Sequence, residues 1–173
     1  TSVDLAALYF VDRVNSSPAN ADAQQQFRQL FETVQASDVN ALRDHFAPYD
    51  QTLIVFVPGM AYESRAENGG DFADQRRLLD GLGLHTELVI TEEFGSVRHN
   101  AQILAAVLRD RATHWERLVV VSASKSGPEA ALALGGLLQP PVIDRVSAWI
   151  SLGGVLRGSP LADTKLDSVA LPL

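Results

Sequence analysis

Three serines and a lysine stand where an apolar run gives way to a helix-like pattern, in the stretch VVVSASKSGPEAALAL at positions 119–134. A serine on a sharp turn between a strand and a helix can act as a nucleophile. Such a turn brings the residues two before and two after the serine close together, so both must be small. Around Ser124 these are Ser122 and Ser126, and Gly127 follows. The spacing makes Ser124 a candidate nucleophile.

The helix that follows this turn meets a second chemical requirement. The N-terminus of a helix presents its positive dipole end and free backbone N–H groups to a developing oxyanion. The backbone N–H of Lys125 is the natural first donor. The side chain of Lys125 is expected to be solvated rather than to serve as a catalytic amine.

The turn has two other interpretations. A serine-rich turn is often only a helix cap, because serine oxygens accept hydrogen bonds from free N–H groups. That interpretation stays open on the residues alone. A phosphate loop of the form G-x-x-x-x-G-K-[ST] would use Lys125 and Ser126, but Val119 and Ser124 occupy its glycine positions. The phosphate loop is therefore excluded.

The segments that must position this turn alternate between strand-like and helix-like patterns. Strands are predicted at 52–59, 86–91, 117–123 and 145–154, and helices at 71–83, 96–112 and 127–138. Apolar strands alternating with helices predict an α/β fold with a mostly parallel sheet flanked by helices. Ligands bind such sheets at the carboxyl ends of the strands. The polar or glycine-rich joints PGMAYESRAENGG, SASKSG and LGGVLRGSP follow three of these ends.

The first fifty residues have a different, helical pattern. In ADAQQQFRQLFETVQ the apolar residues recur at i, i+3, i+4 and i+7, which places them on one helix face. Ser17 ahead of Pro18 and Ser37 further on are expected to cap helices. We expect residues 1–50 to form a helical N-terminal extension and residues 51–173 to form the α/β core.

Three segments resemble the α/β-hydrolase superfamily. VVVSASKSG resembles its nucleophile elbow, usually written G-x-S-x-G, with serine in both glycine positions. LIVFVPGMAYE resembles the strand and loop that supply the oxyanion hole of lipases, and SAWISLGGVLRGSPLAD resembles the strand after the nucleophile helix. The segments occur in the expected order over about residues 50–163. The resemblance implies that Ser124 is the nucleophile and that the N–H groups of Met60 and Lys125 form the oxyanion hole.

The catalytic base is not evident in the sequence. Serine is a poor nucleophile without a base, and in α/β-hydrolases the chain order is Ser, then acid, then His. The four histidines are His45, His85, His99 and His114. All of them precede Ser124, and their positions indicate surface or packing roles.

Three explanations account for the missing histidine. The chain continues beyond Leu173, or a second chain completes the fold, or the protein has no triad. We favour the first, because a parallel sheet that stops here leaves the strand at 145–152 on an uncovered edge. The expected fold is then α/β-hydrolase-like and incomplete at its C-terminus. The acid candidates Asp163 and Asp167 are expected to be surface carboxylates, since no histidine follows them.

Composition excludes several other classes of protein. The net charge of −7 argues against nucleic acid and anionic membrane surfaces as main partners. The chain has no cysteine, and no two histidines have the i, i+4 spacing of a helical metal site, so no metal or cofactor is expected. No segment approaches the roughly 18 apolar residues of a membrane span.

The sequence therefore predicts a lipase-like or esterase-like serine hydrolase, which cleaves small-molecule or lipid esters of carboxylic acids. The alternative is a catalytically incomplete α/β-hydrolase-like module that binds or scaffolds without a triad.

Overall fold

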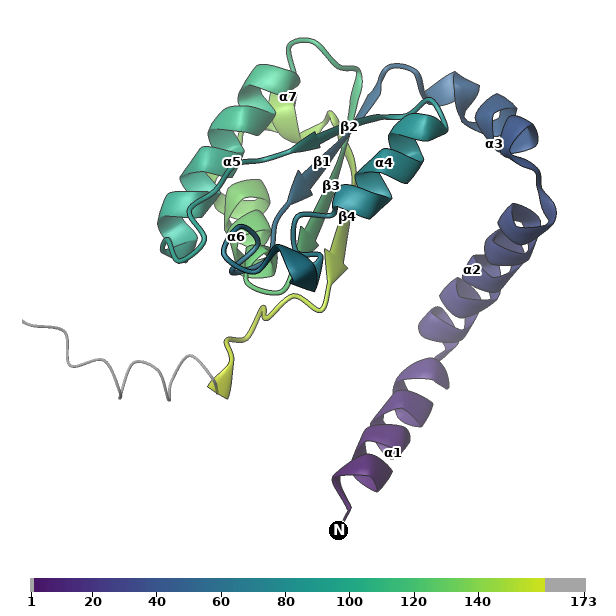
Figure 1. Ribbon diagram of the computed structural model, residues 1–173. Helices are drawn as coiled ribbons and strands as arrows, with labels where there is room; N and C mark the ends of the chain where they lie inside the picture. Colours follow the sequence, from purple (N-terminus) through teal and green to yellow (C-terminus); the bar gives the residue numbers. More distant parts are fainter. Residues whose placement is uncertain (1, 161–173) are drawn as a thin grey trace, which may run out of the picture. The chain divides into compact units, whose positions relative to one another are not determined.

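A computed structural model describes residues 2–160 of the protein. The chain divides into two compact units, Thr1–His45 and Phe46–Leu173. The second unit contains a four-stranded, all-parallel sheet in the order β2-β1-β3-β4 (Figure 1). Its strands are β1 (Thr52–Val57), β2 (His85–Leu88), β3 (Arg117–Ala123) and β4 (Val146–Leu152). The predicted α/β class with a parallel sheet flanked by helices is confirmed.

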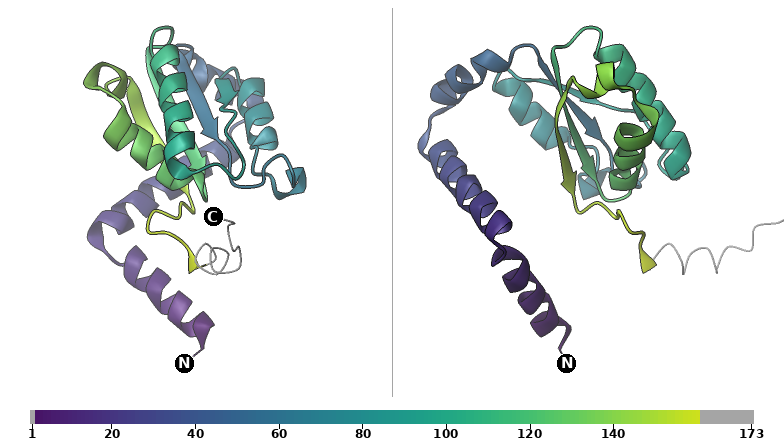
Figure 2. Two further views of the ribbon diagram at one scale, coloured as in Figure 1. Left: turned by 90° about the vertical axis from the view of Figure 1, so that its left-hand side faces the viewer. Right: turned by 180° about the vertical axis from the view of Figure 1, so that it is seen from behind.

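Helices cover both faces of the sheet. The helical elements of this unit are η1 (Ala47–Tyr49), η2 (Ala66–Asn68), α4 (Ala73–Gly81), α5 (Val97–Arg111), α6 (Ser126–Leu132), η3 (Ala133–Leu137) and α7 (Pro140–Ile143). The helices α5 and α6 lie on one face of the sheet and α4 lies on the other (Figure 2). This is the layered arrangement that right-handed strand–helix–strand crossovers produce.

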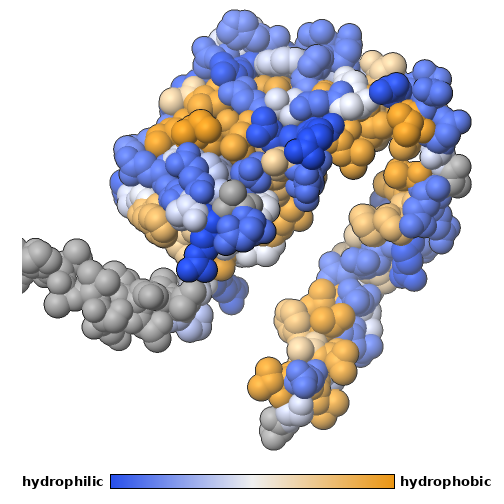
Figure 3. Space-filling view, in the orientation of Figure 1, coloured by the Kyte–Doolittle hydropathy of each residue, from blue (hydrophilic) through white to orange (hydrophobic). Residues whose placement is uncertain are grey.

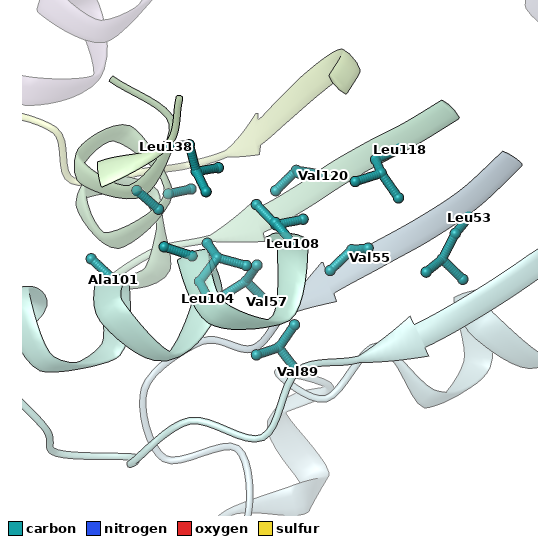
Figure 4. Packing of buried hydrophobic residues seen from close by; sticks show 13 residues of the cluster. Leu53, Val55, Val57, Val89, Ala101, Leu104, Leu108, Leu118, Val120 and Leu138 are labelled. Atoms are coloured by element: carbon teal, nitrogen blue, oxygen red, sulfur yellow. The ribbon is translucent and has the colours of Figure 1, made fainter. Parts of the chain in front are cut away.

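The central strand β1 is buried on both faces, as its continuous apolar run predicts. Val55 and Val57 belong to the cluster beneath α5 and α6, together with Leu104 of α5 (Figure 4). The intervening Phe56 packs on the opposite face, with its ring centroid 4.9 Å from that of Phe72. Burying a side chain of this size stabilises the fold by about 1.5–3 kcal/mol.

The two outer strands are shorter than predicted. The strand predicted at 86–91 ends at Leu88, because only the Val89 N–H, which donates to the Phe56 carbonyl at 2.9 Å, still reaches β1. The last strand, β4, pairs with β3 and forms the other edge of the described sheet. Its Ile150 and Leu152 are 47% and 50% exposed. Within residues 2–160, the strand predicted at 145–152 therefore lies on an uncovered edge.

The helix predicted at 127–138 is two elements. The α-helix α6 begins at Ser126, and the chain passes into a turn of π-helix at η3. The Leu138 N–H donates to the Ala133 carbonyl at 3.1 Å, the i→i+5 bond of a π-helix. Gly135 and Gly136, which weaken an α-helix, lie inside this turn.

The first unit is helical, as predicted. It contains α1 (Val3–Asn15) and α2 (Pro18–Ala36), and α3 (Val39–Phe46) begins in it. The apolar face of α2 is exposed: Phe27 and Phe31 stack with their ring centroids 6.0 Å apart and are 61% and 50% exposed. Figure 3 shows apolar surface along α1 and α2. Among residues 2–160, no helix combines the length and apolar content that crossing a bilayer requires.

The predicted caps of these helices were only partly right. Ser17 occupies the N-cap position of α2, but its hydroxyl donates to the Val14 carbonyl at 3.1 Å instead of capping the helix. Ser37 was the wrong residue for the next cap, because its hydroxyl donates back to the Thr33 carbonyl at 2.8 Å. The Asp38 carboxylate accepts from the Ala41 N–H at 2.8 Å. A carboxylate also interacts favourably with the helix dipole at this end.

Candidate active site

Ser124 lies at the turn between β3 and α6, at the carboxyl edge of the sheet. Its φ of 54° is left-handed, a conformation that costs a residue with a Cβ about 1–2 kcal/mol. Its side chain is exposed. Its N–H donates to the Leu152 carbonyl at 3.0 Å, and its carbonyl accepts from the N–H groups of Gly127 and Val155 at 3.1 and 3.2 Å. Bonds to both flanking segments thus hold the strained turn in place, and such strain is common at functional positions.

The two small residues around Ser124 are buried and satisfied. The Ser122 hydroxyl accepts from the Trp149 indole N–H at 2.9 Å, which ties β3 to β4. The Ser126 hydroxyl lies 2.9 Å from the carbonyls of Val57 and Ala123 and accepts from the Ala123 N–H at 2.8 Å. Both serines therefore have structural partners, and Ser124 is the one of the three whose hydroxyl is exposed.

Gly127 permits a close approach between two backbones. A Cβ placed on it would lie 2.7 Å from the Cα of Gly154, in the segment that follows β4. Real Cβ atoms do not come this close to backbone, so a larger residue would displace the end of β4 or the start of α6. The carbonyl of Ser124 binds the same segment through Val155. The packing of Gly127 thus helps to set the geometry of the turn.

The loop after β1 carries Met60. Its position beside β3 follows from the pairing of β1 with β3, which aligns Val57 with Ser122. Gly59 is buried, and its N–H donates to the Gly70 carbonyl at 3.1 Å. Met60 is 44% exposed, and Ala61 after it has a left-handed φ of 62°. Left-handed residues are thus found both beside Met60 and at the serine turn.

Two backbone donors at this edge lack an acceptor. Among the hydrogen bonds within residues 2–160, none uses the backbone N–H of Met60 or of Lys125. Free N–H groups at a helix N-terminus and on an adjacent loop can stabilise a negative charge that develops on a bound oxygen.

The side chain of Lys125 was expected to be solvated, and that expectation is wrong. Its ammonium group forms an ion pair with the Glu129 carboxylate one turn along α6, and these side chains are only 21% and 2% exposed. The Asn100 amide donates to the same carboxylate at 3.0 Å. A buried carboxylate needs such partners. The i, i+4 spacing of Lys125 and Glu129 was the signal available in the sequence.

Three hydrogen bonds join the β1–α4 loop (residues 58–72) to the β2–α5 loop (residues 89–96). The Tyr62 hydroxyl donates to the Thr91 carbonyl at 2.9 Å, and burial raises the pKa of this phenol. The Glu93 carboxylate accepts from the N–H groups of Glu63 and Ser64 at 2.5 and 2.7 Å. Nothing in the sequence spacing indicated these contacts.

Two of the histidines contact residues other than Ser124. His85 begins β2, at the opposite end of the sheet from the serine turn, and its ring centroid lies 4.9 Å from that of Trp115. His99 in α5 contacts the Glu92 carboxylate at 3.2 Å.

The remaining candidates for a base or an acid are two histidines and two aspartates. His114 follows α5 and lies 2.8 Å from the Thr113 hydroxyl, and His45 belongs to α3. The acid candidates Asp163 and Asp167 lie outside the described residues.

Two hollows are open on the surface of the α/β unit, and neither is lined by Ser124. One lies at the beginning of β1 and β2 and includes Arg111, whose guanidinium donates two hydrogen bonds to Glu87. The other runs between β4 and the α6–η3 segment and includes Trp149. Across residues 2–160, no three His, Asp or Glu side chains come together as a metal site.

Comparison with known proteins gives one informative likeness. No protein-family model matches the chain, and no curated protein matches it. Among solved structures, the crystal structure of the metagenomic carboxyl esterase MGS0156 matches with a TM-score of 0.56 and 30% sequence identity. The match covers 72% of this chain and 38% of the esterase, so the chain spans well under half of that protein's length. The likeness supports a hydrolase-like α/β fold for this protein.

Proposed function

We propose that this protein is a serine hydrolase of the α/β-hydrolase superfamily that cleaves carboxylic esters with Ser124 as its nucleophile. The observation that carries the proposal is the left-handed φ of 54° at an exposed serine between a buried strand and a helix N-terminus. A sharp turn of this kind raises the hydroxyl above the sheet edge, where a substrate can reach it. The likeness to a carboxyl esterase favours ester hydrolysis over other acyl transfers.

The proposed reaction has two steps. The Ser124 oxygen attacks the ester carbonyl carbon while its proton passes to a base. The tetrahedral oxyanion accepts hydrogen bonds from the N–H groups of Met60 and Lys125, of which one donor is worth about 3 kcal/mol. The intermediate then expels the alcohol, which takes the proton from the base. Water attacks the acyl-serine in the same way and releases the carboxylic acid.

The proposal requires a histidine and an acid that act on Ser124, and within residues 2–160 no hydrogen bond joins Ser124 to a histidine or to a carboxylate. Serine needs a base, and the histidines of the chain are on other elements. We propose that a further segment of the natural protein, or a second chain, places them at the carboxyl edge of the sheet. There they would complete the superfamily's Ser–acid–His order. The substrate is a small-molecule or lipid ester.

A fluorophosphonate probe tests this proposal on the complete natural protein. The probe phosphonylates an activated serine, and peptide mapping identifies the residue. We expect labelling on Ser124, and loss of both labelling and esterase activity in Ser124→Ala. Ser147→Ala removes a β4 hydroxyl that donates to the Leu118 carbonyl at 3.2 Å; it is the matched control and should retain both. Undiminished esterase activity in Ser124→Ala would refute the proposal.

The second candidate is a binding or scaffold module with this fold and no triad. It is favoured by one observation, that the four histidines of the chain all precede Ser124. A folded natural protein that takes no label on Ser124 and hydrolyses no ester would support this candidate.

A further inference from the structure

The two proposed oxyanion donors belong to segments that are remote in the chain. Met60 follows β1, and Lys125 precedes α6. An oxyanion hole requires its donors at about 2.7–3.1 Å from a single oxygen position, so the spacing between the two segments has to be held. Pairing of β1 with β3 ends at Val57 and Ser122, before either donor. Contacts beyond the sheet must therefore fix the spacing.

The β2–α5 loop (residues 89–96) contacts the segment that carries the first donor. The Glu93 carboxylate binds the N–H groups of Glu63 and Ser64 at 2.5 and 2.7 Å. The Tyr62 hydroxyl binds the Thr91 carbonyl at 2.9 Å. These three bonds are made by the residues directly after Met60 and the left-handed Ala61, so they hold the turn that presents the Met60 N–H.

The same loop is connected to the second donor through Asn100. The Asn100 side chain donates to the Glu92 carbonyl at 2.8 Å and accepts from the Glu92 N–H at 3.2 Å. It also donates to Glu129 at 3.0 Å, and Glu129 pairs with the Lys125 ammonium. Asn100 and Glu129 are each 1% exposed. A buried network with satisfied partners is rigid, which suits it to fix the start of α6.

We propose that the β2–α5 loop is a positioning element for the oxyanion hole, in which Glu93 aligns Met60 and Asn100 aligns Lys125. The inference rests on the proposed function, because it assigns to the loop a role in the same site. Glu93 acts through the backbone N–H groups of Glu63 and Ser64, and Asn100 acts through the Glu129 side chain, so neither residue contacts a reacting atom. Because the oxyanion forms only in the transition state, misalignment of the donors lowers kcat and leaves KM nearly unchanged.

The variant Glu93→Gln tests the first half of the proposal in the complete natural protein. It removes the negative charge of the Glu93 carboxylate, which accepts from the two N–H groups. The Glu93 side chain is partly exposed. We expect kcat for a simple ester to fall about tenfold, part of the 10²–10³-fold loss seen when a donor is removed, with KM within about twofold. The matched control is Glu92→Gln in the same loop, because the Glu92 side chain contacts His99 and not the β1–α4 loop.

Amide hydrogen exchange gives a readout that does not depend on catalysis. In Glu93→Gln the amides of Glu63 and Ser64 should exchange at least about tenfold faster, while Glu92→Gln leaves them unchanged. If Ser124→Ala retains full activity, the proposed function fails, and exchange alone decides whether Glu93 holds the loop. The proposal is overturned if the Glu63 and Ser64 amides exchange at the same rate in Glu93→Gln and Glu92→Gln. It is also overturned if these amides exchange faster in Glu93→Gln while kcat stays constant in an enzyme that depends on Ser124.

The variant Asn100→Ser tests the second half and its link to the first. It shortens the side chain, so the bond to Glu129 is lost while a polar group remains at the buried position. We expect kcat to fall about tenfold, and the double variant with Glu93→Gln to lose less than the product of the two effects, because both act on one oxyanion. If kcat of the double variant falls by the full product of the two single effects, Glu93 and Asn100 do not act on the same oxyanion hole. Should Asn100→Ser not fold, Asn100→Gln replaces it in the same cycle.

Discussion

The backbone strain at Ser124 and the proposed role of its hydroxyl can be tested together by a single substitution. Its φ of 54° costs a residue with a Cβ about 1–2 kcal/mol, whereas glycine adopts this conformation freely. Glycine also gains freedom in the unfolded chain, which offsets about 0.5–1 kcal/mol of the relief. We therefore expect Ser124→Gly to raise the free energy of unfolding by about 0.5–1 kcal/mol.

Comparison with Ser124→Ala separates the effect of the left-handed backbone on the free energy of unfolding from the effect of losing the hydroxyl. Alanine also removes the hydroxyl, which makes no hydrogen bond within residues 2–160, and it keeps the Cβ that makes the turn strained. Its free energy of unfolding should stay within about 0.5 kcal/mol of the parent. At an ordinary helical or extended position glycine is less stable than alanine by about 0.5–1 kcal/mol. At Ser124 the order should be reversed.

Urea unfolding and probe labelling together check this prediction. Both variants should lose fluorophosphonate labelling. The glycine variant should have the higher urea midpoint, while the free energy of unfolding depends on urea concentration with the same slope in both variants. A glycine variant that unfolds at the same urea concentration as the alanine variant, or at a lower one, would refute the argument that this turn is strained. Loss of labelling with gain of stability would show the trade-off expected at a catalytic turn.

Three further predictions concern packing and charge. Leu104→Ala should lower the free energy of unfolding by about 3 kcal/mol in urea titration, because the fully buried side chain leaves a cavity. Gly127→Ala should lower it by at least about 1 kcal/mol and abolish labelling, because the added Cβ meets Gly154; an unchanged, labelled variant would contradict the close packing. The Ser64 N–H lowers the pKa of Glu93 below its usual value of 4.5. A depressed pKa contributes stability above the unfolded pKa that is lost as pH falls through the folded pKa. The thermal unfolding temperature should therefore fall more steeply below about pH 4.5 in the parent than in Glu93→Gln. Parallel curves of unfolding temperature against pH would contradict this prediction.

Much of the fold could be predicted because it depends on short-range periodicity. The continuous apolar run of β1 and the repeat of three to four residues in α5 identify strand and helix without tertiary information. Element boundaries depend also on strand pairing. The strand β2 ended earlier than its apolar residues suggested, because pairing with β1 stops after Phe56.

The serine turn could be found from the sequence for a steric reason. Small residues on both sides of Ser124, between a strand and a helix, are what a sharp turn requires, and Ser122 and Ser126 are buried against their neighbours. The roles of Ser124, Met60 and Lys125 in catalysis stay predictions. The sequence could not show where the Lys125 side chain goes, because burial of Glu129 depends on α5 packing beside α6.

The sequence by itself determined the alternation of strands and helices, the helical first unit and the serine at the β3–α6 turn, since each depends on neighbours a few residues away. Tertiary structure alone decided which carboxylates support the carboxyl edge of the sheet. Glu93 binds a loop that precedes it by about thirty residues, and Asn100 reaches Glu129 on another helix. Such contacts leave no periodic pattern, because they form only when strand pairing and helix packing bring remote segments within hydrogen-bonding distance.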